Sequence, residues 1–572
     1  MNYKETYQEW LSNPYFDEDT KKELTAIEND ENEIKERFYA DLAFGTAGLR
    51  GIIGAGINRM NIYVVRRATQ GLANYIAKVD KKSQGVAIAY DSRHMSPEFA
   101  QEAALCLAAN GIKAYIFPSL RPTPMLSFAL RELGCTAGVV VTASHNPPQY
   151  NGYKVYWEDG AQITAPKDKQ IITEVQAITD FAQVKTMSEE DAKAAGLYEV
   201  IGEEIDDKYM EALKKLVLRP EAIKEQADKL KIVYTPLHGT GNIPVRRVLK
   251  ELGFNNVYVV KEQELPDGDF PTVSYPNPED KNAFTLALKL AAEVDADIVL
   301  ATDPDADRLG IYAKNEKTGE YESFTGNMSG MLILEYLLSQ RKELGMLPEN
   351  GAVVTTIVSG KMARAIAKEY NVALIETLTG FKYIGEQIKF FEQNHDHEFL
   401  FGYEESYGCL EGTHARDKDA VVAVMALCEA AAYYKSKGIT LCEQMEKLYQ
   451  KYGFYKESLF FQTFPGAEGK AKIDGLMDAL RNQPPKQVGP FKVTALEDYK
   501  KSVRTDIVTG ETSALILPES NVLYFELEDG AWFCVRPSGT EPKIKYYAGV
   551  KGTDAQDAAD KLEALSKAVV EL

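Results

Sequence analysis

Three carboxylates alternate with uncharged residues in one short segment, at Asp303, Asp305 and Asp307. They directly follow the apolar run Ile298–Ala301, which is typical of a buried strand. Carboxylates this close repel one another, so the arrangement needs a cation. Ligands that are all oxygen favour a hard ion, Mg²⁺ or Mn²⁺. An EF-hand loop is excluded, because basic residues stand where that loop needs glycine and its last glutamate.

Two arginines could bind a phosphate group. Arg308 adjoins the last carboxylate, where a guanidinium suits a phosphate that is bridged to the metal. Near the C-terminus, the segment Arg536–Thr540 offers one guanidinium, two hydroxyls and a flexible backbone. Read alone, the second segment is equally well explained as an ordinary Pro-Gly turn.

A serine and a histidine are adjacent after another apolar run. Gly138–Val141 leads into Ser144 and His145, so the serine is expected at the carboxyl end of a strand, where α/β proteins bind ligands. A serine hydrolase is an alternative, but the Gly-x-Ser-x-Gly elbow is missing. In a fourth segment Glu404 and Ser406 follow a strand-like run, and their side chains could hold adjacent sugar hydroxyls.

Charge and composition limit the classes of protein that fit. With 65 basic and 85 acidic residues the net charge is −20, which argues against nucleic acid or an anionic membrane as partner. The six cysteines have neither disulfide-scaffold nor zinc spacing. The N-terminus does not resemble a signal peptide, and no apolar run reaches the ~18 residues that span a bilayer. We therefore expect a cytoplasmic protein with reduced thiols.

Strand, loop and helix patterns repeat three times between residue 60 and about residue 455, which predicts three α/β units with mixed or parallel sheets. Asp529-Gly530 lies between two apolar runs and predicts a hairpin in a C-terminal α+β region. The first 40 residues predict a solvated helical extension. The predicted domains are 1–40 (extension), 41–220, 221–322, 323–454 and 455–572.

Together these segments resemble the α-D-phosphohexomutase family. The serine loop, the aspartate loop, the Glu404–Ser406 loop and the Arg536–Thr540 loop occur in the order of that family. Further matches are Gly45–Gly51, Asn151–Lys154 and Gly380–Lys382. The resemblance covers nearly the whole chain after residue 40.

The resemblance implies an α/β fold of four domains in a heart-shaped molecule: three related α/β domains with mixed sheets, then an α+β domain. It implies that Ser144 is carried as phosphoserine and is a metal ligand with Asp303, Asp305 and Asp307. One Mg²⁺ per subunit is expected. The expected catalytic residues are Ser144, His145, Arg50, Lys154 and Lys382. The expected substrate-binding residues are Arg308, Glu404, Ser406, Arg536, Ser538, Gly539 and Thr540.

The family interconverts sugar phosphates, so the resemblance implies the isomerisation of glucose 1-phosphate and glucose 6-phosphate, with glucose 1,6-bisphosphate as intermediate and activator. Mannose or pentose phosphates are alternative substrates, because Gly402-Tyr403-Glu404 departs from the common Gly-Gly-Glu pattern. Some branches carry histidine where this chain has Phe381-Lys382, so the resemblance does not imply a histidine base there. A glucosamine phosphate is a weaker alternative. Another class, a non-catalytic sugar-phosphate sensor, would predict damage to Ser144 or to the aspartates, and both are intact. The expected partners are small hexose phosphates, and the expected assembly is a monomer or a homodimer.

Overall fold

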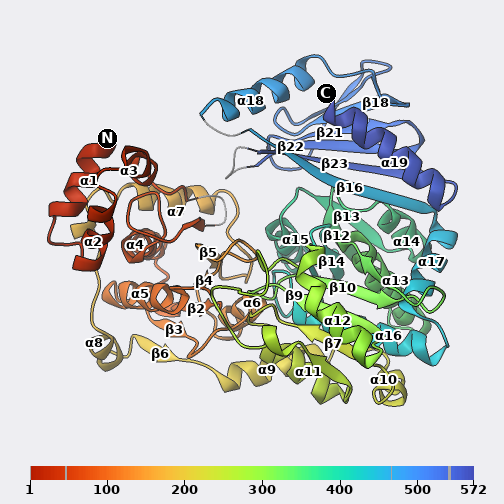
Figure 1. The fold of residues 1–572 in the computed structure, drawn as a ribbon, viewed down its shortest axis with the longest axis horizontal. Coiled ribbons are helices and arrows are strands. Elements are labelled where there is room, and N and C mark those ends of the chain that lie inside the picture. Colours follow the sequence, from red (N-terminus) through yellow and green to blue (C-terminus); the bar gives the residue numbers. More distant parts are fainter. Residues whose placement is uncertain (1, 45–47, 465–466, 539–542) are drawn as a thin grey trace. The chain divides into compact units, whose positions relative to one another are not determined.

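The computed structural model describes residues 2–44, 48–464, 467–538 and 543–572. They form two compact units. The first unit comprises Met1–Gly326 and Phe381–Thr440, and the second comprises Asn327–Gly380 and Leu441–Leu572. Figure 1 labels most of their helices and strands.

The first unit contains a six-stranded mixed sheet with the strand order β1-β5-β4-β2-β3-β6. β4, β2, β3 and β6 run parallel, whereas β5 is antiparallel to both of its neighbours. All residues of β2 and β4 are buried, as expected for strands covered by helices on both faces. The strands are β1 (Gly48–Ile52), β2 (Val86–Tyr90), β3 (Ala114–Ile116), β4 (Ala137–Val141), β5 (Tyr150–Trp157) and β6 (Tyr198–Val200).

Helices of this region share a hydrophobic core with the sheet. Side chains of α4 and α5 pack in one cluster with residues of β2 and β4. Asn61 caps the N-terminus of α4 by accepting a hydrogen bond from the backbone of Val64. The helices are α4 (Ile62–Lys78), α5 (Ser96–Ala109), α6 (Thr123–Glu132), α7 (Lys167–Gln176), α8 (Glu189–Ala194), α9 (Glu203–Lys214) and α10 (Pro220–Gln226).

A second sheet of the first unit has the order β11-β10-β9-β7-β8. β7, β8 and β9 are parallel, and β10 pairs antiparallel with β9, so the segment 303–308 forms the connection between β9 and β10. The elements are β7 (Ile232–Thr235), α11 (Asn242–Leu252), β8 (Val257–Val259), α12 (Thr285–Val294), β9 (Ile298–Thr302), β10 (Leu309–Lys314) and β11 (Tyr321–Phe324).

The remaining part of the first unit carries the Glu404 segment. β14 pairs antiparallel with β15, and the segment 404–408 connects the two strands. The elements are α15 (Phe381–Asn394), β14 (Glu398–Tyr403), β15 (Cys409–Glu411) and α16 (Ala420–Ser436). α16 is buried along most of its length, which explains its apolar sequence.

The N-terminal extension is helical, but the expectation that it is solvated is wrong. Its helices α1 (Tyr3–Ser12), α2 (Glu18–Ala26) and α3 (Glu31–Phe38) form a hydrophobic core that also includes Ala55 and Tyr63. Trp10 and Phe16 are 1% and 2% exposed, and their rings stack at 4.1 Å. Most of the charged side chains are exposed and the apolar side chains face the core, so the high charge density of the sequence conceals an apolar face.

The second unit combines a parallel pair of strands with an antiparallel sheet. β12 pairs parallel with β13, and the larger sheet has the order β16-β23-β22-β21-β18-β19-β20, with β17 paired to β18. The strands are β12 (Gly351–Thr356), β13 (Ala373–Thr377), β16 (Phe454–Thr463), β17 (Gln487–Val488), β18 (Phe491–Asp498), β19 (Val503–Asp506), β20 (Thr512–Ala514), β21 (Leu523–Leu527), β22 (Trp532–Pro537) and β23 (Lys543–Gly552). The helices are α13 (Gly326–Glu343), α14 (Met362–Tyr370), α17 (Leu441–Tyr452), α18 (Ala467–Asn482) and α19 (Ala555–Val570).

The C-terminal hairpin prediction is confirmed. β21 and β22 pair antiparallel across the turn that contains Asp529 and Gly530. Both residues have positive φ, 60° and 73°, which is what a tight primed turn requires. Among the described residues, none of the helices has the length and apolar character that crossing a membrane would need.

Glu457, on β16, is a carboxyl group whose protonation affects the stability of the second unit. Its Oε2 accepts a hydrogen bond from Asn327 Nδ2 at 3.3 Å. Burial raises the pKa of Glu457 to about 7, and Asn327 and Lys361 offset this only in part. The folded state therefore holds a proton that the unfolded chain has already released above its ordinary pKa.

We expect the stability of the wild type to fall as the pH rises from the unfolded pKa of Glu457 through its folded pKa. Between about pH 5 and about pH 8 the loss relative to Glu457→Gln is expected to be roughly 2 kcal/mol, because glutamine preserves the neutral form. Urea unfolding of both proteins across this range measures it. Identical pH profiles of the two proteins would contradict the assignment.

Candidate active site

Ser144 lies just beyond β4 in a left-handed backbone conformation. Its φ is 51°, a region that costs a non-glycine residue about 1–3 kcal/mol and that recurs at active sites. The Ser144 N–H donates a hydrogen bond to Thr142 Oγ1 at 2.8 Å. The Thr142 hydroxyl donates in turn to Asp91 Oδ2 at 2.6 Å. Two buried side chains thus fix the position of the serine.

Arg93 organises the whole loop around Ser144, and sequence reasoning did not identify it. Its side chain is fully buried and lies 3.3 Å from the Asp91 carboxylate. The guanidinium donates hydrogen bonds of 2.5–3.0 Å to four backbone carbonyls of the serine loop, those of Ser144, Asn146, Pro147 and Tyr150. A planar group with five donors is the only side chain that can satisfy so many acceptors at once.

Arg93→Met is therefore expected to destabilise the protein by about 3–5 kcal/mol, because it leaves the buried Asp91 carboxylate without its cationic partner and several buried carbonyls without this donor. Chemical denaturation measures the change. Arg93→Lys serves as the control, since it keeps the charge but loses the fork of donors, and an intermediate loss is expected. A loss below about 1 kcal/mol in Arg93→Met would contradict this role.

The three aspartates form one buried group. Their carboxylate oxygens lie within 4.8 Å of one another, and the side chains are almost inaccessible to solvent. Ser144 Oγ donates a hydrogen bond to Asp303 Oδ2 at 2.7 Å. The other oxygen of Asp303 accepts hydrogen bonds from the N–H groups of Asp307 and Arg308, at 3.1 Å each. The structure therefore brings the predicted serine and the predicted metal ligands together.

Two lysines lie against the aspartate group. Lys154, on β5, has its Nζ 2.9 Å from Asp305 Oδ2. Lys418 has its Nζ 2.9 Å from Asp307 Oδ2, and the sequence analysis missed this residue. The run of four charged residues from 416 to 419, just before a long apolar helix, was a signal that could have indicated it. Thr123, also missed, donates from its hydroxyl to Asp305 Oδ2 at 2.9 Å.

Burial and neighbouring charges separate the pKa values of these groups. Burial, with repulsion from the two other aspartates, raises the pKa of Asp303 well above its ordinary value. Burial acts on Asp305 in the same direction, but the ammonium of Lys154 outweighs it and lowers the pKa of Asp305. The pKa of Lys418 is raised, because attraction to Asp307 exceeds the effect of burial.

The aspartate group fits a divalent cation. Asp305 Oδ1 and Asp307 Oδ1 are buried, and neither has a hydrogen-bond partner. Two carboxylate oxygens are therefore left without a hydrogen-bond donor in a low-dielectric environment. A hard cation bound by these oxygens would supply the missing interactions.

His145 and Arg50 lie close to the serine. The His145 Nδ1 is 3.2 Å from Ser144 Oγ. Burial lowers the pKa of His145 well below its ordinary value, and the charges of Arg308 and Arg50 lower it further, so the imidazole is neutral near pH 7. Arg50, on β1, donates to Asn146 Oδ1 at 3.2 Å. The structure thus places both predicted residues at the serine loop.

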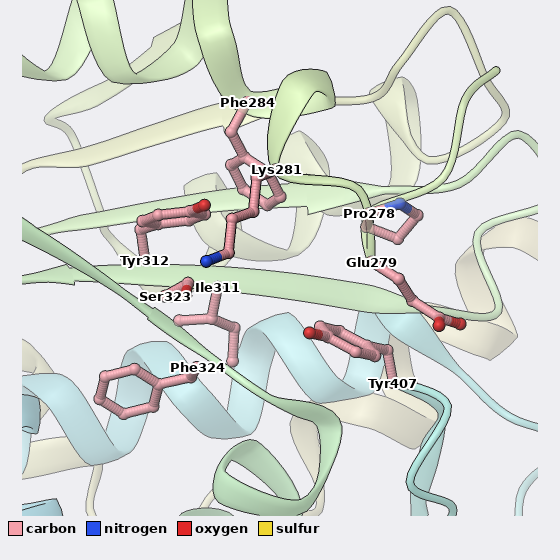
Figure 2. Close-up of a pocket in the computed structure, with 9 residues that line it drawn as sticks. All are labelled: Pro278, Glu279, Lys281, Phe284, Ile311, Tyr312, Ser323, Phe324 and Tyr407. Carbon is pink, nitrogen blue, oxygen red and sulfur yellow. The ribbon is translucent and has the colours of Figure 1, made fainter. Parts of the chain in front are cut away.

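Arg308 is held in place by Glu279, another residue that the sequence analysis did not identify. Its guanidinium donates to the Glu279 carboxylate, and its Nε lies 3.7 Å from Asp307 Oδ1. Figure 2 shows Glu279 at one end of a small pocket, close to Tyr407. The Tyr407 carbonyl accepts a hydrogen bond from the backbone N–H of Leu309 at 2.9 Å, which joins the Glu404 segment to the end of the aspartate loop.

Glu404 and Ser406 lie in the connection between β14 and β15. Glu404 is buried, and its N–H donates to the Gly408 carbonyl at 2.8 Å, which closes this turn. Lys382 is the second residue of α15, with its ammonium 5.1 Å from the ring centre of Tyr383.

The expected phosphate-binding residues belong to the second unit. Arg536 is the fifth residue of β22, where its backbone pairs with Lys545 of β23. Ser538 follows this strand, and its N–H donates to the Lys543 carbonyl at 2.8 Å. Gly539 and Thr540 lie outside the described residues, as do residues 45–47 of the predicted glycine-rich match.

Comparison with known proteins decides the family. The chain matches four consecutive domain models described as phosphoglucomutase/phosphomannomutase, alpha/beta/alpha domains I, II and III and the C-terminal domain, at residues 41–181, 207–318, 325–452 and 484–565. These matches span most of the chain. The chain belongs to the phosphoglucomutase/phosphomannomutase family. The expected fold class of three α/β domains followed by an α+β domain is therefore confirmed, and the protein is a mutase of the isomerase class.

Curated members of the phosphoglucomutase/phosphomannomutase family are similar over nearly their full length. A phosphoglucomutase from Staphylococcus epidermidis is 40% identical over 520 residues, which cover 91% of this chain and 92% of that protein. A phosphoglucomutase from Staphylococcus aureus is 38% identical over 534 residues, which cover 93% of this chain and 94% of the relative.

Solved structures of the family share the fold at lower identity. A putative phosphomannomutase from Thermus thermophilus has a TM-score of 0.68 at 21% identity, covering 93% of this chain and 99% of its own. The phosphoglucomutase parafusin from Paramecium has a TM-score of 0.67 at 19% identity, covering 93% and 94%. These similarities concern the architecture alone.

Proposed function

We propose that the protein interconverts glucose 1-phosphate and glucose 6-phosphate through a phosphoserine at Ser144. The observation that carries the proposal is the 2.7 Å hydrogen bond from Ser144 Oγ to Asp303 inside the buried aspartate group. A hydroxyl in that position can carry a phosphoryl group next to a metal and several cations. The two staphylococcal relatives, both named phosphoglucomutase, support glucose as the sugar.

The reaction consists of two phosphoryl transfers in opposite directions. In the first, the P–O bond to Ser144 Oγ breaks, and a bond forms between phosphorus and the free hydroxyl oxygen of the sugar monophosphate. The proton of that hydroxyl leaves to a neighbouring base, and Ser144 takes up a proton. The product, glucose 1,6-bisphosphate, reorients and returns its other phosphate to Ser144. The same bisphosphate therefore primes an unphosphorylated enzyme and acts as activator.

Residues of this chain position the reacting groups and balance their charge. Lys154 and Lys418 hold the carboxylates of Asp305 and Asp307 at 2.9 Å. Arg50 and Arg308 supply positive charge near the serine, where charge is spread over the phosphoryl oxygens during transfer. We assign proton exchange with the sugar hydroxyl to three residues: His145, Lys154 and Lys382.

We propose that Asp303, Asp305, Asp307 and the Ser144 phosphate hold one Mg²⁺ per subunit. When bound, Mg²⁺ would polarise the phosphoryl oxygens and neutralise negative charge. The buried oxygens of Asp305 and Asp307 that lack a hydrogen-bond donor support this assignment.

Substrate contacts are proposed for the remaining predicted residues. Glu404 and Ser406 would hold sugar hydroxyls in both orientations of the bisphosphate. Four residues would hold the phosphate that does not react: Arg536, Ser538, Gly539 and Thr540. This division of roles rests on the family motifs in the sequence.

The domain boundaries, the cellular compartment and the assembly are proposals as well. We propose that the four domains begin near residues 41, 221, 323 and 455. We place the protein in the cytoplasm, because its six cysteines are buried free thiols that suit a reducing compartment. We propose that it is a monomer or a homodimer. Sedimentation analysis distinguishes the two assemblies.

A comparison of four substrates tests the sugar. We expect kcat/KM to be highest for glucose 1-phosphate among the 1-phosphates of glucose, mannose, glucosamine and ribose, with a trace of the matching bisphosphate. A preference below about tenfold would correspond to less than about 1.4 kcal/mol of differential transition-state binding. Highest activity on mannose or ribose phosphate would replace glucose as the substrate, and release of inorganic phosphate without isomerisation would indicate a phosphatase.

A further inference from the structure

The N-terminal extension is not part of the region that the family models describe. The first of those models begins at residue 41, whereas helices α1 to α3 occupy residues 3–38. The extension is nevertheless packed firmly against the first sheet region, because Tyr63 of α4 lies in the same core as Trp10 and Phe16. The Tyr63 hydroxyl also donates a hydrogen bond to Asp17 at 2.7 Å.

Two side chains of the extension bind both backbone groups of one residue, Ala55. Glu23 Oε1 accepts a hydrogen bond from the Ala55 N–H at 3.1 Å. The Arg37 guanidinium donates to the Ala55 carbonyl at 3.1 Å. Glu23 and Arg37 also form an ion pair with each other. Ala55 is 3% exposed, so its polar groups depend on these two partners.

The turn that contains Ala55 is shaped to receive the extension. Gly54 and Gly56 have φ of 153° and 131°, and a Cβ on either would lie 2.9 Å from atoms of Glu23 or Arg37. The backbone of Arg37 takes part as well, because its carbonyl accepts a hydrogen bond from Asn58 N–H at 2.9 Å. Side chains at both glycines would displace the two residues that bind Ala55.

This turn directly continues the strand that carries Arg50. β1 ends at Ile52, whose carbonyl accepts a hydrogen bond from the Met60 N–H at 2.8 Å, so the turn closes back on the end of the strand. Next to Arg50, a Cβ on Gly51 would lie 2.8 Å from the side chain of Leu42, which leaves the strand little room to shift. Arg50 itself reaches Asn146 in the serine loop.

We infer that the N-terminal extension is a brace for the active site, in which Glu23 and Arg37 are positioning residues that fix the strand of Arg50 through the turn at Ala55. The inference rests on the role of Arg50 in the proposed function. Small displacements of a charged group can change a rate strongly, because phosphoryl transfer depends on preorganised positive charge.

The test combines Arg37→Met with Arg50→Ala. In the otherwise wild-type protein we expect Arg37→Met to lower kcat/KM about tenfold, mainly through kcat, with the fold retained. In the Arg50→Ala background the same change is expected to cost less than about twofold, because the group that it positions is gone. Glu23→Ala is expected to behave like Arg37→Met, whereas Glu23→Gln keeps the acceptor and restores most of the activity.

Lys4→Met is the matched control, since Lys4 forms an exposed ion pair with Glu31 in the same extension, at 2.8 Å. We expect it to leave kcat unchanged. Hydrogen exchange of residues 48–60 provides a readout that needs no substrate, and we expect faster exchange there in Arg37→Met but not in Lys4→Met. Should Arg37→Met fold poorly, Arg37→Lys replaces it.

The outcomes separate the brace from the proposed function. An equal loss for Arg37→Met in both backgrounds, or full activity in the single variant, would overturn the brace. Full activity of Arg50→Ala would overturn it too, by removing its target. A wild-type protein that converts none of the four sugar phosphates would refute the proposed function, and unchanged exchange in residues 48–60 would then overturn the brace separately.

Discussion

Ser144→Ala is expected to abolish mutase turnover, with kcat falling by at least about 10⁴-fold, because both half-reactions of the proposed mechanism pass through Ser144 Oγ. The cations, the carboxylates and the sugar-binding residues remain in the variant, but they have no phosphoryl group to transfer. The measurement is the conversion of glucose 1-phosphate with and without added glucose 1,6-bisphosphate. Intact-mass analysis adds a direct readout, since the variant should lose the mass of one phosphate.

The fold of Ser144→Ala is expected to survive. The change removes one hydroxyl and its hydrogen bond to Asp303, and the left-handed backbone remains fixed by Arg93 and Thr142. Ser119→Ala is a suitable control, because Ser119 is exposed and its hydroxyl accepts a hydrogen bond from Arg121, at 2.7 Å, rather than from a residue of the proposed site. Near-normal turnover in Ser144→Ala, or an unchanged phosphate content, would refute the phosphoserine assignment.

The sequence was most informative where function depends on short segments at strand ends. The predicted strand Gly138–Val141 is β4 without its first residue, and Ile298–Ala301 is β9 without its last residue. A buried strand must be apolar throughout, so the change to polar residues marks its end clearly. That change is also where α/β proteins place ligands, which is why Ser144 and the aspartates could be selected from sequence as candidate site residues.

The residues that support these segments could not be predicted in the same way. Lys418 is 111 positions from Asp307, its partner at 2.9 Å, so only the folded chain brings the two charges together. Arg93 binds backbone carbonyls, and because every residue has a carbonyl, the sequence does not show which of them an arginine will bind. A buried arginine therefore cannot be distinguished from a surface arginine in the sequence alone.

The N-terminal extension shows a limit of reasoning from charge. Its acidic clusters predicted a solvated segment, yet the aromatic residues between them form a core. Helical periodicity places Tyr7 and Trp10 on one face, and only that face is buried. The average polarity of the segment does not reveal such a face, because a short helix needs only a few apolar residues to pack against its neighbours.

Removal of divalent metal is expected to lower kcat by about 10³-fold or more, and Mg²⁺ should restore it, because the metal compensates charge on the transferring phosphoryl group. The structure gives the physical reason for a second effect. Asp305 Oδ1 and Asp307 Oδ1 are buried without a hydrogen-bond donor, so the metal-free site leaves two carboxylate oxygens unsatisfied. Binding of Mg²⁺ at about 100 times its Kd would stabilise the folded protein by about 2.7 kcal/mol.

Thermal unfolding with and without Mg²⁺ tests this second effect without any substrate. We expect the Tm of the wild type to rise with Mg²⁺ and the rise to vanish in Asp307→Asn, which lacks one of the unsatisfied anionic oxygens. Asp295→Asn is the matched control, because Asp295 is an exposed aspartate that pairs with Lys314 at 2.8 Å outside the group. It should keep the full rise in Tm. Equal Mg²⁺ responses in the wild type and Asp307→Asn would mean that the ion binds elsewhere, and full turnover after exhaustive chelation would exclude a catalytic metal at the aspartates.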